Sequence, residues 1–325
     1  MRREPAVSGA VGPFISASGE ARPMTADPPV HRIEFDIPWP PDTAYAYLLD
    51  ADELILVDAG APGETATDTL REGLAEAGYE LSDIEHLLIT HPHTDHGGQV
   101  ATIVEAADPV VYTLSGVRKR LTRDPDDLAA AVRRNAVEVG IPDPKKEVDR
   151  AVDSLRRNRN CLPPEHIDIE LAPGETVEAG GLTFEAIHVP GHQENQAAFR
   201  HGDRLFAGDT AVEPFRPAAL HVGLDDGCRE AIDAFHRGLD ALEAVAPAID
   251  CVYPGHGPVF EDLPTVVERD RESLETLATD CRRTLADLGG GDGLRGDRRP
   301  HREPRKTTVH ALRVSRRART TGTAG

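Results

Sequence analysis

Three imidazoles and one carboxylate fall within six positions of one short stretch, residues 90–98. They belong to His91, His93, Asp95 and His96. Neutral imidazole and carboxylate are side-chain ligands that suit zinc, iron and manganese. His and Asp are costly to bury without partners, so packing alone does not explain this density. The stretch therefore predicts a metal site.

The flanking sequence indicates which elements carry this stretch. The apolar run at residues 87–89 predicts a buried strand, and residues 99–106 predict an amphipathic helix after a Gly pair. The cluster then lies on the loop between the strand and the helix. Side chains two apart on an extended loop point the same way, so His91 and His93 can hold one ion. Asp95 and His96, at the helix entrance, can serve a second ion.

The spacing His91-x-His93-x-Asp95-His96 resembles the HxHxDH signature of the metallo-β-lactamase superfamily. Four more motifs of that superfamily occur in the expected order between about residues 31 and 288: one precedes this stretch, at residues 58–60, and three follow it, at residues 190–192, 208–209 and 254–257. The resemblance implies that His192 completes a three-histidine site with His91 and His93. It also implies that His256 joins Asp95 and His96 around a second ion, and that Asp209 bridges the two ions.

Three further features bear on this resemblance. Asp58 matches a strand-end aspartate that orients the metal loop, although an ordinary turn residue has the same sequence signature. Gly191 is expected to permit a close approach to the metal. Residues 193–196, Gln-Glu-Asn-Gln, depart from the small hydroxyl residue and Gly found in many relatives.

Six other histidines fit no ligand spacing and are interpreted as surface or core residues: His86, His166, His188, His201, His221 and His236.

The resemblance implies a dinuclear hydrolase that uses a metal-bridging hydroxide on an ester or thioester. Two divalent ions, with Zn²⁺ expected and Fe or Mn as alternatives, lower the pKa of a shared water and polarise the substrate. Asp95 would also orient the hydroxide. The glyoxalase-II-like branch, whose hydroxyacylglutathione hydrolases cleave thioesters, is the expected branch. The alternatives are a phosphodiesterase or nuclease, a lactonase, and a catalytically idle metal-binding regulator.

The order of predicted strands and helices favours an α+β fold, the αβ/βα four-layer sandwich. This domain is expected to span residues 31–288, with a helical cap inserted at about residues 114–160. In the cap, Leu128, Val132, Val137 and Val139 are expected to face inward. Residues 1–30 are expected to form a disordered extension. Residues 289–325 read as a disordered basic tail or a mispredicted C-terminus.

Composition restricts the partners and the compartment. The formal net charge is −20, and lysine occurs at only four positions. An acidic, lysine-poor surface indicates a halophilic protein, with GC-rich codon bias as the competing interpretation. It also disfavours nucleic acid, so we expect a small-molecule substrate. No apolar run or signal peptide predicts a membrane association, and the four dispersed cysteines indicate a reducing cytoplasm. The sequence does not specify the oligomeric state.

Overall fold

The computed structural model describes residues 27–213, 218 and 230–287. The predicted basic tail and nearly all of the predicted N-terminal extension lie outside these residues. His221 and Cys228 also lie outside them.

The first half of the chain forms a six-stranded sheet with the order β1-β2-β3-β4-β5-β6. The first three strands pair antiparallel, and β3 to β6 pair parallel. Crossover segments between the parallel strands place the ends of β3, β4 and β5 at one edge of the sheet. The strands are β1 (Val30–Asp36), β2 (Thr43–Leu49), β3 (Leu54–Val57), β4 (Ile84–Leu88), β5 (Val110–Leu114) and β6 (Ile169–Leu171).

The second half forms a five-stranded sheet with the order β11-β10-β9-β8-β7. Its strands pair antiparallel except for β10 and β11, which are parallel. The strands are β7 (Thr176–Ala179), β8 (Leu182–His188), β9 (Ala197–His201), β10 (Arg204–Gly208) and β11 (Cys251–Pro254).

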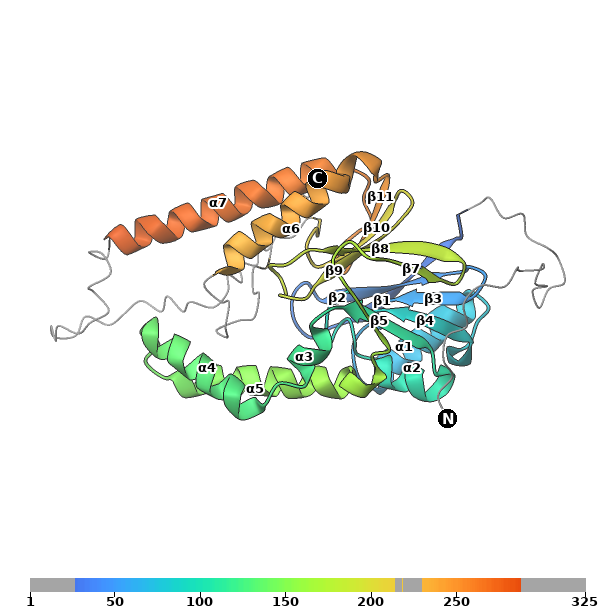
Figure 1. The fold of residues 1–325 in the computed structure, drawn as a ribbon, viewed down its shortest axis with the longest axis horizontal. Helices are drawn as coiled ribbons and strands as arrows, with labels where there is room; N and C mark the ends of the chain where they lie inside the picture. The colour runs from blue at the N-terminus through green and yellow to red at the C-terminus, as the bar shows by residue number, and fades with distance from the viewer. Residues whose placement is uncertain (1–26, 214–217, 219–229, 288–325) are drawn as a thin grey trace, which may run out of the picture.

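The two sheets pack face to face and each carries helices on its outer side (Figure 1). A buried aromatic layer that includes Tyr47, Tyr112, Phe184, Phe199 and Phe206 lies between the sheets. Helices α1 (Glu64–Glu76) and α2 (Val100–Ala107) cover the first sheet. Helices α6 (Ala231–Val245) and α7 (Leu263–Asp287) cover the second. The predicted αβ/βα sandwich is confirmed. Short 3₁₀ turns at Leu81–Asp83, Pro164–His166 and Ala246–Ala248 connect the elements.

Three helices separate β5 from β6: α3 (Val117–Leu121), α4 (Pro125–Glu138) and α5 (Pro144–Cys161). Asp124 and Asp143 cap the N-termini of α4 and α5, each followed by a Pro that suits the first helical turn. Helices α4 and α5 pack through a small apolar core of Leu128, Val132, Val148 and Leu155. In Figure 1 this pair extends to the same side of the sheets as α6 and α7.

The prediction that Val137 and Val139 face inward is wrong. Their exposed fractions are 61% and 47%. Leu128, Val132 and Ala136 recur at four-residue spacing and form the buried stripe of α4, so Val137 is rotated off that stripe. Val139 lies beyond the helix end at Glu138. The apolar face of α4 is therefore narrower than predicted, and the helix ends before Val139.

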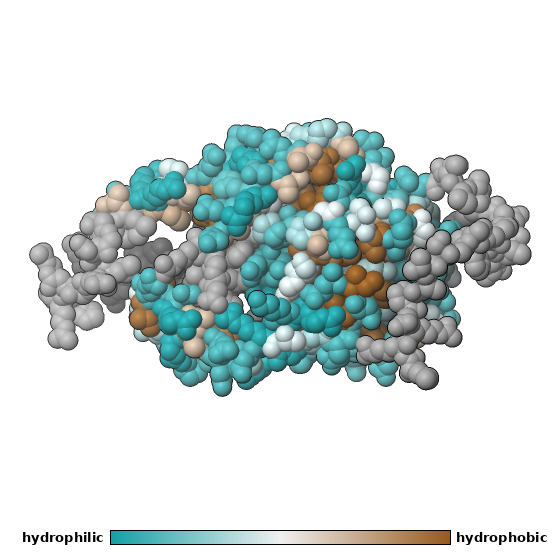
Figure 2. Space-filling view, viewed as in Figure 1, coloured by the Kyte–Doolittle hydropathy of each residue, from teal (hydrophilic) through white to brown (hydrophobic). Residues whose placement is uncertain are grey.

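Figure 2 shows that hydrophilic residues dominate this face of the molecule over the helices, as the 28% charged content requires. In the part of the chain that the structure describes, no helix is both long enough and apolar enough to cross a membrane.

Candidate metal centre

The predicted site residues lie on four loops that each follow a strand. Residues 90–98 follow β4, His192 follows β8, Asp209 follows β10 and His256 follows β11. Backbone hydrogen bonds join two of these loops to strands of the opposite sheet, β9 and β2. Ala197 donates its N–H to the carbonyl of Thr90 at 2.9 Å, and Tyr45 donates to the carbonyl of Gly255 at 3.0 Å. Open α/β sheets place their ligand sites at such strand ends.

The structure brings all seven predicted ligands into one cluster. Their ligand atoms form three groups, each within 4.8 Å: His91, His93 and His192; Asp95, His96 and His256; and His91, His96 and Asp209. The first two groups are the two predicted ion sites. The role of these residues as metal ligands remains a prediction.

Asp209 lies between the two predicted sites. Its Oδ2 is 3.3 Å from Nε2 of His192 and 3.2 Å from Nε2 of His256. Its Oδ1 is 3.2 Å from Nε2 of His96. One carboxylate therefore contacts histidines of both groups, as a bridging ligand must.

Four of the five histidines have an oxygen at the ring nitrogen that faces away from the cluster. Nδ1 of His192 donates to the carbonyl of Ala218 at 3.1 Å, and Nδ1 of His256 donates to the carbonyl of Thr43 at 2.6 Å. Nδ1 of His96 lies 2.8 Å from Oδ2 of Asp58, and Nδ1 of His91 lies 3.1 Å from Oγ1 of Thr90. A proton held on Nδ1 leaves the Nε2 lone pair free for a cation.

Asp58 fixes the loop of residues 90–98 through side-chain hydrogen bonds. Its carboxylate accepts hydrogen bonds from the backbone N–H of Thr90 at 2.8 Å and from Nδ1 of His96. The Thr90 hydroxyl also donates to Asp58, at 2.9 Å, so it is free to accept from His91. These contacts support the orienting role expected for Asp58, beyond that of a turn residue.

Asp58→Asn is expected to lower zinc affinity about 10–100-fold while the fold is retained. The backbone of Asp58 has φ 59°, a conformation that Asn tolerates, so the change leaves the turn intact. The amide cannot accept from both Thr90 and His96 as the carboxylate does. Chelator competition measures the affinity, and circular dichroism checks the fold. Unchanged zinc affinity would contradict the orienting role.

The electrostatics divide the five imidazoles of the cluster. The pKa values of His91, His93 and His192 are lowered, which favours neutral rings, whereas those of His96 and His256, beside Asp209, are raised. Burial lowers the pKa of His91 and of His93 well below the usual value, and neighbouring imidazoles lower both further. Burial also lowers the pKa of His96, but Asp209 and Asp58 more than offset it and raise that pKa well above the usual value. Burial raises the pKa of Asp209, yet His256 and His96 hold it well below its ordinary range.

These residues fit metal ions. Nε2 of His91, Nδ1 of His93 and Nε2 of His192 converge, with 3.0 Å from His93 to each of the other two. A single cation can bind all three ring nitrogens at one point, whereas their lone pairs cannot bind one another. Nε2 of His96 and Oδ1 of Asp209 are also buried; they lie 3.2 Å apart, but neither meets hydrogen-bond geometry with the other or with another described residue. Nitrogen and oxygen donors in this combination are ligands for zinc, iron and manganese.

Two glycines near the cluster serve different purposes. A Cβ atom at Gly255 would lie 2.3 Å from Oδ1 of Asp209 and 2.6 Å from Cε1 of His96, so only glycine lets this loop approach the site. Gly191 does not have the expected role. Its φ is +128°, and a Cβ atom there would lie 2.3 Å from Cα of Phe235 in α6. Gly191 is needed for its backbone conformation and for helix packing, not for metal approach.

Two glutamines were not identified as site residues from the sequence. Gln193 is 4% exposed and its amide contacts Nε2 of His93. Gln196 is fully buried, and with its amide oxygen toward Thr210 it accepts from the backbone N–H of Asp209 at 3.3 Å. Both lie in the segment that departs from the superfamily pattern. No local sequence signal distinguishes such a buried glutamine from a surface one.

The other histidines and Tyr253 have separate surroundings. His86 pairs with Glu53 at 2.6 Å and with the hydroxyl of Tyr112 at 3.2 Å. The ring of Tyr253 stacks on Phe206 with centroids 5.0 Å apart, which indicates a packing role. His166, His188, His201 and His236 belong to none of the three ligand groups found among the described residues.

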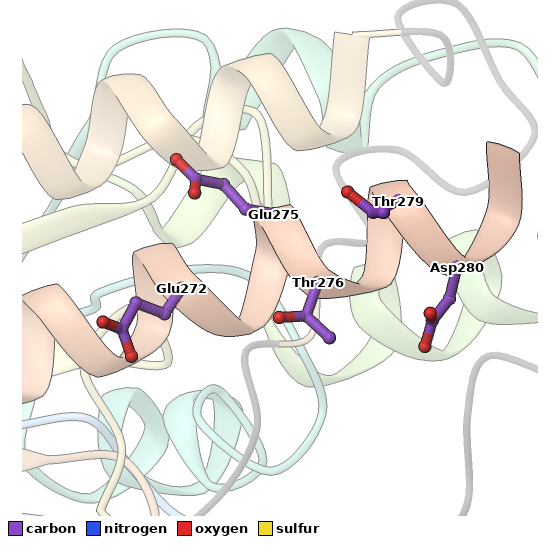
Figure 3. Close-up of a pocket in the computed structure, with 5 residues that line it drawn as sticks. All are labelled: Glu272, Glu275, Thr276, Thr279 and Asp280. Atoms are coloured by element: carbon purple, nitrogen blue, oxygen red, sulfur yellow. The ribbon is translucent and has the colours of Figure 1, made fainter. Parts of the chain in front are cut away.

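A surface pocket of about 380 Å³ lies on α7, apart from these ligand groups (Figure 3). Its described lining consists of five polar side chains at helical spacing: Glu272, Glu275, Thr276, Thr279 and Asp280. This lining comes from one face of one helix and holds none of the predicted ligands, so we assign this pocket no part in the chemistry.

Comparison with known proteins agrees with the geometry. The family model described as the metallo-beta-lactamase superfamily matches residues 39–256. The chain belongs to this superfamily. A probable metallo-hydrolase of Bacillus subtilis, YqjP, is 24% identical over 261 residues, which cover 79% of this chain and 80% of the relative.

Two further proteins are similar to the chain. A hydroxyacylglutathione hydrolase of Pseudomonas paraeruginosa is 29% identical over 209 residues, which cover 62% of this chain and 57% of that enzyme. The crystal structure of the metallo-beta-lactamase family protein TTHA1429 from Thermus thermophilus matches with a TM-score of 0.62 and 25% identity. It covers 80% of this chain and 81% of that protein. These similarities support a superfamily hydrolase fold without specifying a substrate.

Proposed function

We propose that this chain is a hydrolase that binds two divalent cations, with Zn²⁺ expected, and cleaves an ester or thioester. The observation that carries the proposal is the position of Asp209, whose carboxylate contacts histidines of both predicted ion sites. When bound, two such cations supply a water of lowered pKa and polarise the substrate carbonyl.

The chain's own residues would hold and orient the reactants. Asp95 is 7% exposed, and its Oδ2 lies 3.7 Å from Nε2 of His256. Its carboxylate therefore faces the cluster and is placed to orient the attacking water. Asp58 and Thr90 would keep His91 and His96 fixed during the reaction, so that little reorganisation accompanies it.

Cys161 is a poor candidate for a protein nucleophile. Its thiol is half-buried, and burial raises its pKa above the usual value; the charge of Arg157 opposes this shift in part, and the Asp95 carboxylate adds to it. A reactive cysteine requires the opposite shift, because the thiolate is the nucleophile. This supports direct attack by water over a covalent intermediate on this thiol.

The insert between β5 and β6 favours a substrate with negative charge. Residues 117–161 contain twelve Lys and Arg against eight Asp and Glu, whereas the whole chain has 36 against 56. Asn195 donates to the carbonyl of Ser115 at 2.9 Å, which joins the segment after His192 to the residues just before α3, and the positive charge of Arg120 in α3 also lowers the pKa of His93. The similarity to a hydroxyacylglutathione hydrolase, an enzyme named for an anionic thioester, agrees with this substrate class.

The test is a hydrolysis screen of the zinc-loaded full chain at low and high salt. The substrates are an acyl-coenzyme A thioester, a neutral N-acetylcysteamine thioester, a p-nitrophenyl ester, a lactone and bis(p-nitrophenyl) phosphate. We expect kcat/KM for the anionic thioester to exceed that for the neutral one about tenfold at low salt, with the difference shrinking as salt screens the charges.

Each contrary outcome identifies a different alternative. A preference for the phosphodiester would replace the proposal by a phosphodiesterase, and a preference for the lactone would replace it by a lactonase. Absence of turnover on all substrates with two ions bound would favour an idle metal-binding regulator.

A further inference from the structure

His93 is the one cluster histidine whose second ring nitrogen faces no backbone carbonyl, carboxylate or hydroxyl among the described contacts. Its Nδ1 points into the cluster, 3.0 Å from Nε2 of His91 and 3.0 Å from Nε2 of His192. Its Nε2 instead contacts the side-chain amide of Gln193. Gln193 therefore occupies the position that an oxygen acceptor occupies for each of the other four histidines.

The position of the proton on His93 decides whether it can bind a cation. A neutral imidazole carries one N–H and one lone pair. Because Nδ1 faces the cluster, it binds a metal only when the proton is on Nε2. A buried Nε2–H needs an acceptor, and an amide NH₂ cannot provide one. An NH₂ that donates to Nε2 would instead force the proton onto Nδ1 and block the site.

We propose that Gln193 presents its carbonyl oxygen to His93 and so fixes the Nε2–H tautomer, which makes Gln193 a positioning residue for the metal site. In the structure the amide nitrogen faces His93, but the amide oxygen is buried without a hydrogen-bond partner among the described residues. No donor in the described part of the chain holds the amide in that orientation, and a half-turn about its last bond exchanges the two atoms. The consequence for metal binding rests on the proposed function; the tautomer itself does not.

This role accounts for the departure from the superfamily pattern after His192. Gln193 is 4% exposed, whereas its neighbour Glu194 is exposed, so the chain buries the first residue of the segment against the cluster. A small hydroxyl side chain at this position would be shorter by two atoms than Gln. The length of Gln193 is what lets the residue after one predicted ligand reach the ring of another, His93.

The first test measures zinc affinity of the full chain by chelator competition in two variants. Gln193→Met keeps the length of the side chain but removes the acceptor, and we expect affinity to fall about 10–100-fold. Gln193→Glu offers only acceptors, and we expect it to bind zinc within about threefold of the wild type. Glu194→Met is the matched control and should bind zinc as the wild type does. Thermal unfolding of each metal-free variant checks that the fold is retained.

The second test reads the tautomer directly in metal-free protein. Long-range ¹H–¹⁵N spectra of the ¹⁵N-histidine-labelled full chain distinguish the two neutral tautomers, with His93→Ala used to assign the signal. We expect Nε2–H in the wild type and in Gln193→Glu, and loss of this preference in Gln193→Met.

The outcomes separate this inference from the proposed function. An Nδ1–H tautomer in the wild type would overturn the assignment of Gln193, and so would a Gln193→Met variant with undiminished zinc affinity. A folded Gln193→Glu variant as weak as Gln193→Met would also overturn it. If the wild-type chain bound no metal but showed Nε2–H on His93, the proposed function would be refuted and the role of Gln193 in fixing the tautomer would be retained.

Discussion

Asp209→Ala is expected to lower kcat/KM for the best substrate about a hundredfold or more and to remove most of the metal from the second site. The carboxylate contacts His192 of one predicted site and both His96 and His256 of the other. It is also the buried negative charge that raises the pKa values of His96 and His256. Without it, two adjacent cations would repel each other with no anionic ligand between them.

The measurements for Asp209→Ala are metal content after desalting and steady-state kinetics at saturating zinc. Asp209→Asn retains the shape of the side chain but not its charge, and should be nearly as impaired. Asp233→Ala, which removes an exposed carboxylate of α6, is the matched control and should behave as the wild type. Wild-type turnover by Asp209→Ala would refute the bridging assignment.

The elements that carry the site could be predicted because their sequence signals are local. The apolar run before His91 identified a strand, and the residues after its end carried the ligand types. The inter-sheet arrangement was expected from the order of predicted strands and helices, in agreement with the superfamily resemblance. It is confirmed by the family match and by the two stacked sheets.

Other features of the site depend on contacts that leave no local trace in the sequence. The acceptor for His256 is the backbone carbonyl of Thr43, and a carbonyl is present at every residue. Gly191 was assigned to metal approach because it precedes His192, whereas its neighbour in space is Phe235, 44 positions later. Glutamine is a residue type usually found on the surface, and only the folded chain shows that Gln193 and Gln196 are buried at the site.

Zinc loading is expected to bring the metal content to about two ions per chain and to raise the thermal midpoint, and removal by a chelator is expected to abolish hydrolysis. A ligand that binds only the folded state stabilises it by RT ln(1 + [L]/Kd), about 4 kcal/mol at a thousandfold excess over Kd. The gain should be large here because the metal-free cluster holds converging ring nitrogens and a buried carboxylate oxygen without a hydrogen-bond partner among the described residues.

The two predicted sites can be emptied separately, which makes the stoichiometry a sharp test. His256→Ala removes a member of the group with Asp95 and His96, and should leave about one ion per chain held by His91, His93 and His192. His192→Ala should impair the three-histidine group instead, and the double variant should bind little metal. His236→Ala, outside the three groups, is the control. If both single variants kept two ions, or if the reconstituted wild type bound none, the seven side chains would share a location without sharing a metal, and the hydrolytic proposal would have no nucleophile.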